Sequence, residues 1–204
     1  MALCEPCLQD LPWISHQGCP QCGLPAFGNT LCGHCLKSPP AFDQTRSLFS
    51  YDYPVDALLQ RYKYSGQLSI AQTLGELMAQ SMDMASRPSL IIPMPLHPQR
   101  LRERGFNQAL EIGRVLAKKL HLKLDPHCCT RIRSAPPQVS LPLKQRVKNM
   151  RDAFHCNTRL DGQRVVLLDD VMTTGASLNA LAKTVKATGA VHVECWVVAR
   201  TLPK

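Results

Sequence analysis

The most constraining stretch of this sequence is an apolar run that passes directly into two acidic residues and a short loop. Residues 165–168 predict a buried strand, Asp169 and Asp170 follow it, and residues 174–188 predict a helix that stops at Gly189. A buried strand that leads into a helix is the repeating unit of a parallel sheet covered by helices. Ligands bind such sheets at the carboxyl ends of the strands, where the two aspartates stand.

The rest of the chain alternates in the same way. Further strands are predicted over residues 48–53, 90–95 and 191–199, and further helices from Pro54 onward and over residues 68–84 and 107–120. The sequence contains neither a Gly-x4-Gly-Lys loop nor a Gly-x-Gly-x2-Gly loop, which excludes a Walker site and a dinucleotide fingerprint. We therefore expect an α/β fold with a parallel sheet flanked by helices.

The residues around the two aspartates predict a site for a sugar phosphate. Gly175 lets the backbone turn sharply, and N–H groups at the start of the helix offer an anion cradle. The carboxylates can accept hydrogen bonds from two vicinal hydroxyls, which a ribose offers and a bare inorganic anion lacks. The candidate ligand-binding residues are Asp169, Asp170, Thr173, Thr174, Gly175, Ala176 and Ser177.

Cysteines concentrate at the amino-terminal end. The chain has ten, and six of them form three Cys-x2-Cys pairs within the first 35 residues. Two such pairs about ten residues apart can place four thiolates around one tetrahedral zinc, and so short a segment needs the metal to fold. We expect a zinc-ribbon domain over residues 1–40 with Cys19, Cys22, Cys32 and Cys35 as ligands, followed by the main domain over residues 41–204.

The first pair, Cys4 and Cys7, has no partner pair in this arrangement. The two thiols could be free, could replace one of the other pairs as ligands, or could belong with a further Cys-x2-Cys upstream of this sequence. The residues by themselves leave these alternatives open.

Charge is distributed unevenly along the chain. Residues 1–45 carry a net charge of −2, whereas residues 46–204 hold 23 basic and 12 acidic side chains. A basic body favours a phosphate-bearing partner, and aromatic residues at only 5% favour attraction to a backbone over base stacking. The candidates for binding pyrophosphate or DNA phosphate are Arg100, Arg102, Arg104, Arg131, Arg133 and Arg146.

No stretch approaches the roughly 18 apolar residues that a membrane span requires. The amino terminus also lacks a basic segment followed by an apolar run, which a signal peptide would show. We therefore expect a cytoplasmic protein without a membrane span.

The stretch from Asp169 to Ser177 resembles the phosphoribosyl pyrophosphate motif of type I phosphoribosyltransferases. In that family the acidic pair holds the ribose hydroxyls, the loop holds the 5′-phosphate, and magnesium accompanies the pyrophosphate. The resemblance implies a type I phosphoribosyltransferase-like fold with these roles for the matching residues.

A cysteine-rich head before such a body resembles the ComF/GntX family. The resemblance extends to residues 93–97, the arginines at 100, 102 and 104, residues 105–108, and a second signature over 131–154 that corresponds to the mobile catalytic loop of active transferases. Ala135 departs from the family, where a threonine is expected. Family members often have four Cys-x2-Cys pairs, which favours a missing upstream pair as the explanation for Cys4 and Cys7.

Membership of that family implies a cytosolic protein of natural transformation. Such a protein would associate with incoming single-stranded DNA, work with proteins of the DNA-uptake machinery, and carry a pocket for phosphoribosyl pyrophosphate with magnesium. The alternative is a true phosphoribosyltransferase that transfers ribose 5-phosphate to an unidentified acceptor. Turnover is not implied by the motif alone.

Overall fold

The computed structural model describes residues 3–14, 18–65, 67–82, 84–133 and 153–203. Five strands form one parallel sheet in the order β1-β7-β6-β2-β3. Their bounds are β1 Gln44–Ser50, β2 Leu90–Pro93, β3 Lys123–Leu124, β6 Arg164–Met172 and β7 His192–Arg200. The predicted fold class, a parallel sheet flanked by helices, is confirmed.

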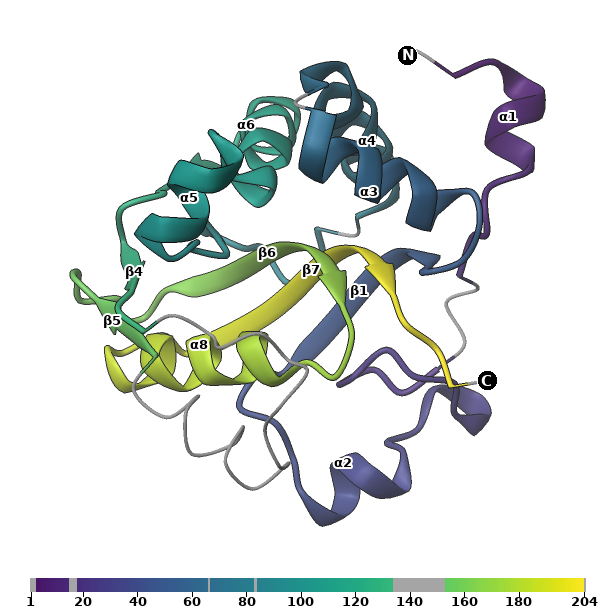
Figure 1. Ribbon diagram of the computed structural model, residues 1–204. Helices are drawn as coiled ribbons and strands as arrows, with labels where there is room; N and C mark the ends of the chain where they lie inside the picture. Colours follow the sequence, from purple (N-terminus) through teal and green to yellow (C-terminus); the bar gives the residue numbers. More distant parts are fainter. Residues whose placement is uncertain (1–2, 15–17, 66, 83, 134–152, 204) are drawn as a thin grey trace.

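Helices cover both faces of this sheet (Figure 1). On one face lie α3 Val55–Ser65, α4 Leu68–Ser81 and α6 Gln108–Leu120, whose apolar side chains share a core with Val166 and Leu168 of β6. On the other face lies α8 Ala176–Ala187, together with the antiparallel pair β4 Cys129–Arg131 and β5 Phe154–Cys156. Side chains of β6 contribute to the cores on both faces of the sheet, because successive residues of a strand point to opposite faces.

The central strand is longer than the sequence predicted. We expected it to end at Leu168 and the next helix to begin at Thr174, but β6 continues to Met172 and α8 begins at Ala176. The ladder continues because β7 is equally long, with Asp169 opposite Val197 and Met172 opposite Arg200. The two aspartates are therefore ladder residues within the strand, and two further residues follow them before the strand ends.

Several elements gave no apolar periodicity in the sequence. Helix α5, Pro98–Arg104, carries no fully buried residue, so hydrophobic spacing could not reveal it. Its ends are nevertheless specified, because His97 accepts a hydrogen bond from the Gln99 N–H at the N-cap and Gly105 adopts φ 77° at the C-cap. Strands β3, β4 and β5 span only two or three residues each, too short for an alternating pattern to be recognised.

The cysteine-rich head contains short elements, namely α1 Glu5–Gln9, the 3-10 turn η1 Phe27–Asn29 and α2 Gly33–Lys37. It packs directly on the edge strand β1, where the backbone N–H of Thr45 donates to the carbonyl of Pro20 at 3.0 Å. Earlier in the chain, Trp13 forms an isolated antiparallel β-bridge with Phe49, and the centroids of their rings lie 4.6 Å apart. The head thus covers the edge of the sheet that β1 would otherwise expose.

Among the residues with described structure, no helix combines the length and the apolar character needed to cross a bilayer.

Candidate functional site

The predicted acidic pair lies in the second half of β6, toward the carboxyl edge of the parallel sheet. Asp169 and Asp170 are neighbours in the strand, so their side chains leave opposite faces of the sheet. Each carboxylate accepts a hydrogen bond from the next backbone N–H, Asp169 from Asp170 at 2.9 Å and Asp170 from Val171 at 2.8 Å. The two carboxylates therefore share an edge but have different surroundings.

Asp170 faces the layer of α3, α4 and α6. Its Oδ2 lies 2.9 Å from Nζ of Lys63 in α3, and the two side chains are 12% and 17% exposed. This partly buried ion pair connects α3 directly to β6. The adjacent Tyr62 fixes this part of α3, because its hydroxyl donates to the carbonyl of Gln108 at 3.0 Å. Sequence reasoning missed Lys63, since a lone lysine in an amphipathic helix carries no motif.

Asp169 faces the other layer, on the side of α8 and the β4–β5 pair. Burial, and then the charge of Asp170, raise the pKa of Asp169 well above its ordinary value. The nearby candidate Arg131 of β4 places its guanidinium 5.4 Å from the centre of the Phe154 ring. Burial lowers the pKa of Arg131, and the charge of Asp169 opposes that change. Asp169 and Arg131 are thus electrostatically linked across this face.

The loop after β6 leaves the start of α8 open to a ligand. Gly175 is the N-cap residue of α8 and has no side chain to cap the helix, and the Thr174 hydroxyl accepts a hydrogen bond from the Ala176 N–H at 3.4 Å. Its φ of 77° is left-handed, and a Cβ at this position would lie 2.7 Å from Cε of Met172. Thr173, Thr174 and Ala176 are exposed beside it and Ser177 is half-buried. The predicted loop residues therefore surround one exposed helix terminus next to the acidic pair.

A buried arginine links this loop to the cysteine-rich head. Arg200, at the end of β7, is only 3% exposed. Its guanidinium donates to the carbonyls of Cys22 at 3.0 Å and Met172 at 2.9 Å, and also to the carbonyls of Thr173 and Thr201. One side chain thus connects the turn between two cysteines of the head with the start of the candidate ligand loop. The only sequence signal that could have identified Arg200 was its position just after an apolar strand.

The arginines predicted near the pyrophosphate lie on α5, which follows β2 at the same edge of the sheet. Arg100 and Arg102 are exposed, and Arg100 pairs with Glu103 at 3.2 Å. Arg104 is partly buried and donates to Oε1 of Gln108 at 2.8 Å. Nε of Arg104 and Nε2 of Gln108 are buried without a partner among the described residues. Two of the α5 arginines therefore face solvent, whereas the third is held by a hydrogen bond to Gln108.

Two other predicted arginines lie beyond β4. Arg133 is exposed, and its carbonyl accepts a hydrogen bond from Nε of Arg131 at 3.3 Å. Arg146 lies outside the described residues, as does Ala135.

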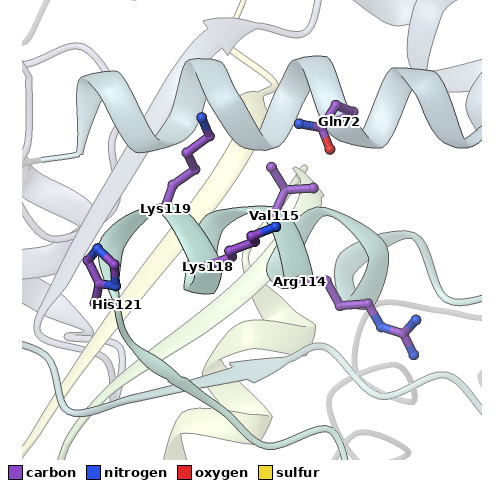
Figure 2. A pocket seen from close by; sticks show the side chains of 6 residues that line it. All are labelled: Gln72, Arg114, Val115, Lys118, Lys119 and His121. Carbon is purple, nitrogen blue, oxygen red and sulfur yellow. The ribbon is translucent and has the colours of Figure 1, made fainter.

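A second basic feature is a groove between α4 and α6, with a volume of about 490 Å³. Figure 2 shows Gln72 of α4 opposite Val115 of α6, with basic side chains around the opening. Those basic side chains are Arg114, Lys118, Lys119 and His121. Because α6 leads back from the carboxyl end of β2 to the start of β3, its last turn lies far from the acidic pair.

The head gathers four predicted metal ligands. The Sγ atoms of Cys19, Cys22, Cys32 and Cys35 all lie within 4.8 Å of one another, and Cys22 and Cys32 are 3.7 Å apart. Metal–sulfur bonds of about 2.3 Å in a tetrahedron place sulfurs about 3.8 Å apart, so the four thiols fit a metal ion such as zinc. Cys4 and Cys7 are exposed on α1 and lie outside this cluster, so they do not replace either of its pairs.

Comparisons with known proteins agree with this architecture. Residues 110–202 match the family described as phosphoribosyl transferase domain. The chain is 35% identical over 191 residues to DNA utilization protein YhgH of Escherichia coli O6:H1, covering 90% of this chain and 84% of that protein. It is 31% identical to Competence protein F of Haemophilus influenzae, covering 97% and 88%, and 25% identical to Competence protein ComFC of Bacillus subtilis, covering 89% and 76%. The chain therefore belongs to the ComF family of competence and DNA utilization proteins, with a phosphoribosyltransferase-like body behind a cysteine-rich head.

Proposed function

We propose that this chain is a cytoplasmic DNA-uptake protein that contacts incoming single-stranded DNA and binds phosphoribosyl pyrophosphate in its body. One observation carries the ligand assignment: the acidic pair of β6 lies beside a helix start whose N-cap is a glycine, at the carboxyl edge of a parallel sheet. Carboxylates suit the ribose hydroxyls, and the exposed N–H groups with the helix dipole suit the 5′-phosphate. The ligand-binding residues are Asp169, Asp170, Thr173, Thr174, Gly175, Ala176 and Ser177.

The pyrophosphate end of the ligand would lie toward cationic side chains at the same edge. Arg100 and Arg102 of α5 are exposed there, and Arg131 stands near Asp169 on the other face. Magnesium would accompany the pyrophosphate, because this hard cation prefers oxygen ligands and is bound largely through substrate phosphates. The carboxylate oxygens of Asp169 and Asp170 are donors of the type it accepts.

Zinc is the metal we propose for the four cysteines of the head, residues 1–40. The four-thiolate set has the ligand type and number of a structural zinc site, and it leaves no position for a catalytic water. Zinc would stabilise a segment whose core consists mainly of those cysteines. This head and the body over residues 41–204 would be the two domains of the protein.

Single-stranded DNA would contact the exposed cations of α5 and of the groove between α4 and α6. Arg100 and Arg102 stand near the ligand site, whereas Lys118 and Lys119 extend the basic surface along α6. Each phosphate contact releases counterions, so the logarithm of affinity should fall with the logarithm of salt by about 0.7 per contact. Proteins of the uptake machinery would be the further partners.

Calorimetric titration with phosphoribosyl pyrophosphate and magnesium, with and without single-stranded DNA, tests the proposal. We expect binding by the zinc-loaded protein and none by the Asp169→Ala/Asp170→Ala variant at unchanged secondary structure. A double variant that binds normally would contradict the site. A change in affinity when DNA is present would couple the two ligands.

The proposed binding of single-stranded DNA is tested with separate variants. Replacing Arg100 and Arg102 by alanine, or Lys118 and Lys119 by alanine, should flatten the salt dependence of DNA binding without altering the ligand loop. Arg104 is left in place because it supports Gln108. Equal slopes for the wild-type chain and both variants would exclude these two surfaces as the DNA-binding face.

A phosphoribosyltransferase reaction is the second candidate function. The observation that favours it is the ordering of charge at the site, with Lys63 on Asp170 and Arg131 near Asp169. Carboxylates positioned in this way would stabilise a ribosyl cation, and Arg131 would stabilise the departing pyrophosphate, while the bond from ribose C1 to pyrophosphate breaks and the acceptor takes its place. Release of pyrophosphate above the level of the double aspartate variant, with nucleobases, DNA or water as acceptor, would establish turnover. Binding without release would leave the chain as a ligand-sensing protein.

A further inference from the structure

A second group of cysteines lies in the body, at the base of the β4–β5 pair. The Sγ atoms of Cys128, Cys129 and Cys156 all lie within 4.8 Å of one another. They come from two segments far apart in the chain, which the antiparallel pairing of Cys129 with Cys156 brings together. The sequence gave no warning of this group, because neither Cys128-Cys129 nor the lone Cys156 has ligand spacing.

The geometry of this group matches that of the head. Sγ of Cys128 lies 3.8 Å from Sγ of Cys156, compared with 3.7 Å between Cys22 and Cys32. Both separations are close to the value of about 3.8 Å that metal–sulfur bonds of about 2.3 Å require. They are much longer than the roughly 2.0 Å of a disulfide.

The three cysteines are shielded from solvent except on one side. Cys128 and Cys129 are 1% and 2% exposed, whereas Cys156 is partly exposed and gives an entry path. The hydroxyl of Thr188 lies 3.5 Å from Sγ of Cys156 and donates to the carbonyl of Val185 at 2.9 Å. Sγ of Cys156 also lies 3.2 Å from the carbonyl of Thr158, which accepts a hydrogen bond from the thiol.

We propose that Cys128, Cys129 and Cys156 form a second metal site, which takes a thiophilic ion, zinc or monovalent copper. Soft thiolates select these two ions, and binding would release the thiol protons. Within the described parts of the chain, no fourth histidine, cysteine or carboxylate joins the group. Three ligands satisfy monovalent copper, and zinc would complete its tetrahedron with water.

A bound ion would fasten the ends of β4 and β5 to each other. The ladder has its outer hydrogen bonds from Asn157 N–H to the Cys128 carbonyl at 2.8 Å and from Ile132 N–H to the Ala153 carbonyl at 2.9 Å. The same antiparallel pair carries Arg131, whose pKa responds to the charge of Asp169. The second ion would therefore support a cation of the candidate ligand site without touching the ligand.

Metal stoichiometry of the full-length chain tests the site independently of the proposed function. The parent for the test is the Cys4→Ser/Cys7→Ser chain, which removes the exposed pair as a background binder. The metal-free, reduced parent is titrated with zinc against a chromophoric chelator, with cobalt for its sulfur charge-transfer band, and with monovalent copper against a copper chelator. We expect two equivalents in the parent and one after the added change Cys156→Ser.

Two matched variants make the result decisive. Cys195→Ser changes a buried cysteine of β7 outside the cluster and should keep two equivalents. Cys32→Ser/Cys35→Ser removes half of the head site and should keep the equivalent in the body. Cys128→Ser is the second probe if Cys156→Ser fails to fold by circular dichroism.

The zinc and copper titrations show which of the two ions the site binds. A second equivalent of either zinc or copper, lost with Cys156, supports the site and identifies its ion. One equivalent of each metal in the parent, unchanged by Cys156→Ser or Cys128→Ser, would overturn the proposal. Loss of two of the three thiols to a disulfide in air, with no metal bound beforehand, would overturn it as well.

Discussion

Lys63 of α3 and Asp170 of β6 meet across one face of the sheet, with Nζ 2.9 Å from Oδ2. The pair connects a helix near the start of the body with the strand that carries the acidic motif, more than a hundred residues later. Its effect is to give two adjacent aspartates unlike environments, because Asp170 pairs directly with Lys63 whereas Asp169 lies on the opposite face, beside the charge of Asp170. The first two predictions concern this asymmetry.

Removing the cation should weaken both fold and ligand binding. We expect Lys63→Met to lower the free energy of unfolding by about 1–3 kcal/mol, since it leaves a mostly buried carboxylate without its partner. Affinity for phosphoribosyl pyrophosphate should fall about tenfold, because the uncompensated charge of Asp170 repels the phosphates. Denaturant unfolding and calorimetry measure the two effects. Lys183→Met, on the exposed side of α8, is the control and should change neither quantity.

The raised pKa of Asp169 predicts an unusual pH dependence. A carboxyl whose folded pKa lies above its unfolded value contributes most to stability when protonated in both states, at a pH below the ordinary aspartate value. That contribution is lost as pH rises through the folded pKa, by about 1.4 kcal/mol per unit of difference. Asp169→Asn should therefore be more stable than the wild-type chain near pH 8, and the difference should shrink toward pH 4.

Thermal melts over that range check the prediction, with Asp10→Asn as the baseline for an exposed carboxylate. A constant difference between Asp169→Asn and wild type at every pH would contradict it.

Arg200 should couple the head to the ligand loop. Its guanidinium donates to carbonyls of Cys22, Met172 and Thr173, and a lysine cannot reproduce that fork. Arg200→Lys should lower stability by about 2–4 kcal/mol through lost and unsatisfied hydrogen bonds. The variant should also weaken phosphoribosyl pyrophosphate binding. The carbonyls of Met172 and Thr173, at the start of the ligand loop, would lose their hydrogen bonds to the guanidinium.

Calorimetry at a temperature where the variant is folded separates the two effects. Arg114→Lys, an exposed change on α6, is the matched control. Ligand affinity equal to that of the wild-type chain would mean that Arg200 supports the fold alone.

The left-handed turn at Gly175 should not accept a side chain. Gly175→Ala places a Cβ 2.7 Å from Cε of Met172 at φ 77°, and we expect a loss of about 1–3 kcal/mol in stability. The loop must shift to relieve this contact, so ligand affinity should fall with it. Gly33→Ala is the control, because a Cβ there meets nothing within 4 Å. A variant with normal melting temperature and affinity would show that the turn tolerates a side chain.

Local patterns in the sequence determined much of this protein. The apolar run before Asp169, the helical spacing after it and the alternation of such units were sufficient for a parallel α/β sheet. The spacing of Cys19, Cys22, Cys32 and Cys35 identified the four thiols that converge in the head. These features could be inferred because strand, helix and knuckle each depend on residues close in the chain.

Only the tertiary structure decided which distant residues complete each site. Lys63 reaches Asp170 because α3 packs on β6, and Arg200 reaches Cys22 because the head docks on the edge of the sheet. The three thiols of the body meet because β4 pairs with β5 in one register. No local pattern encodes such meetings, since they depend on how layers pack and on which strands become neighbours.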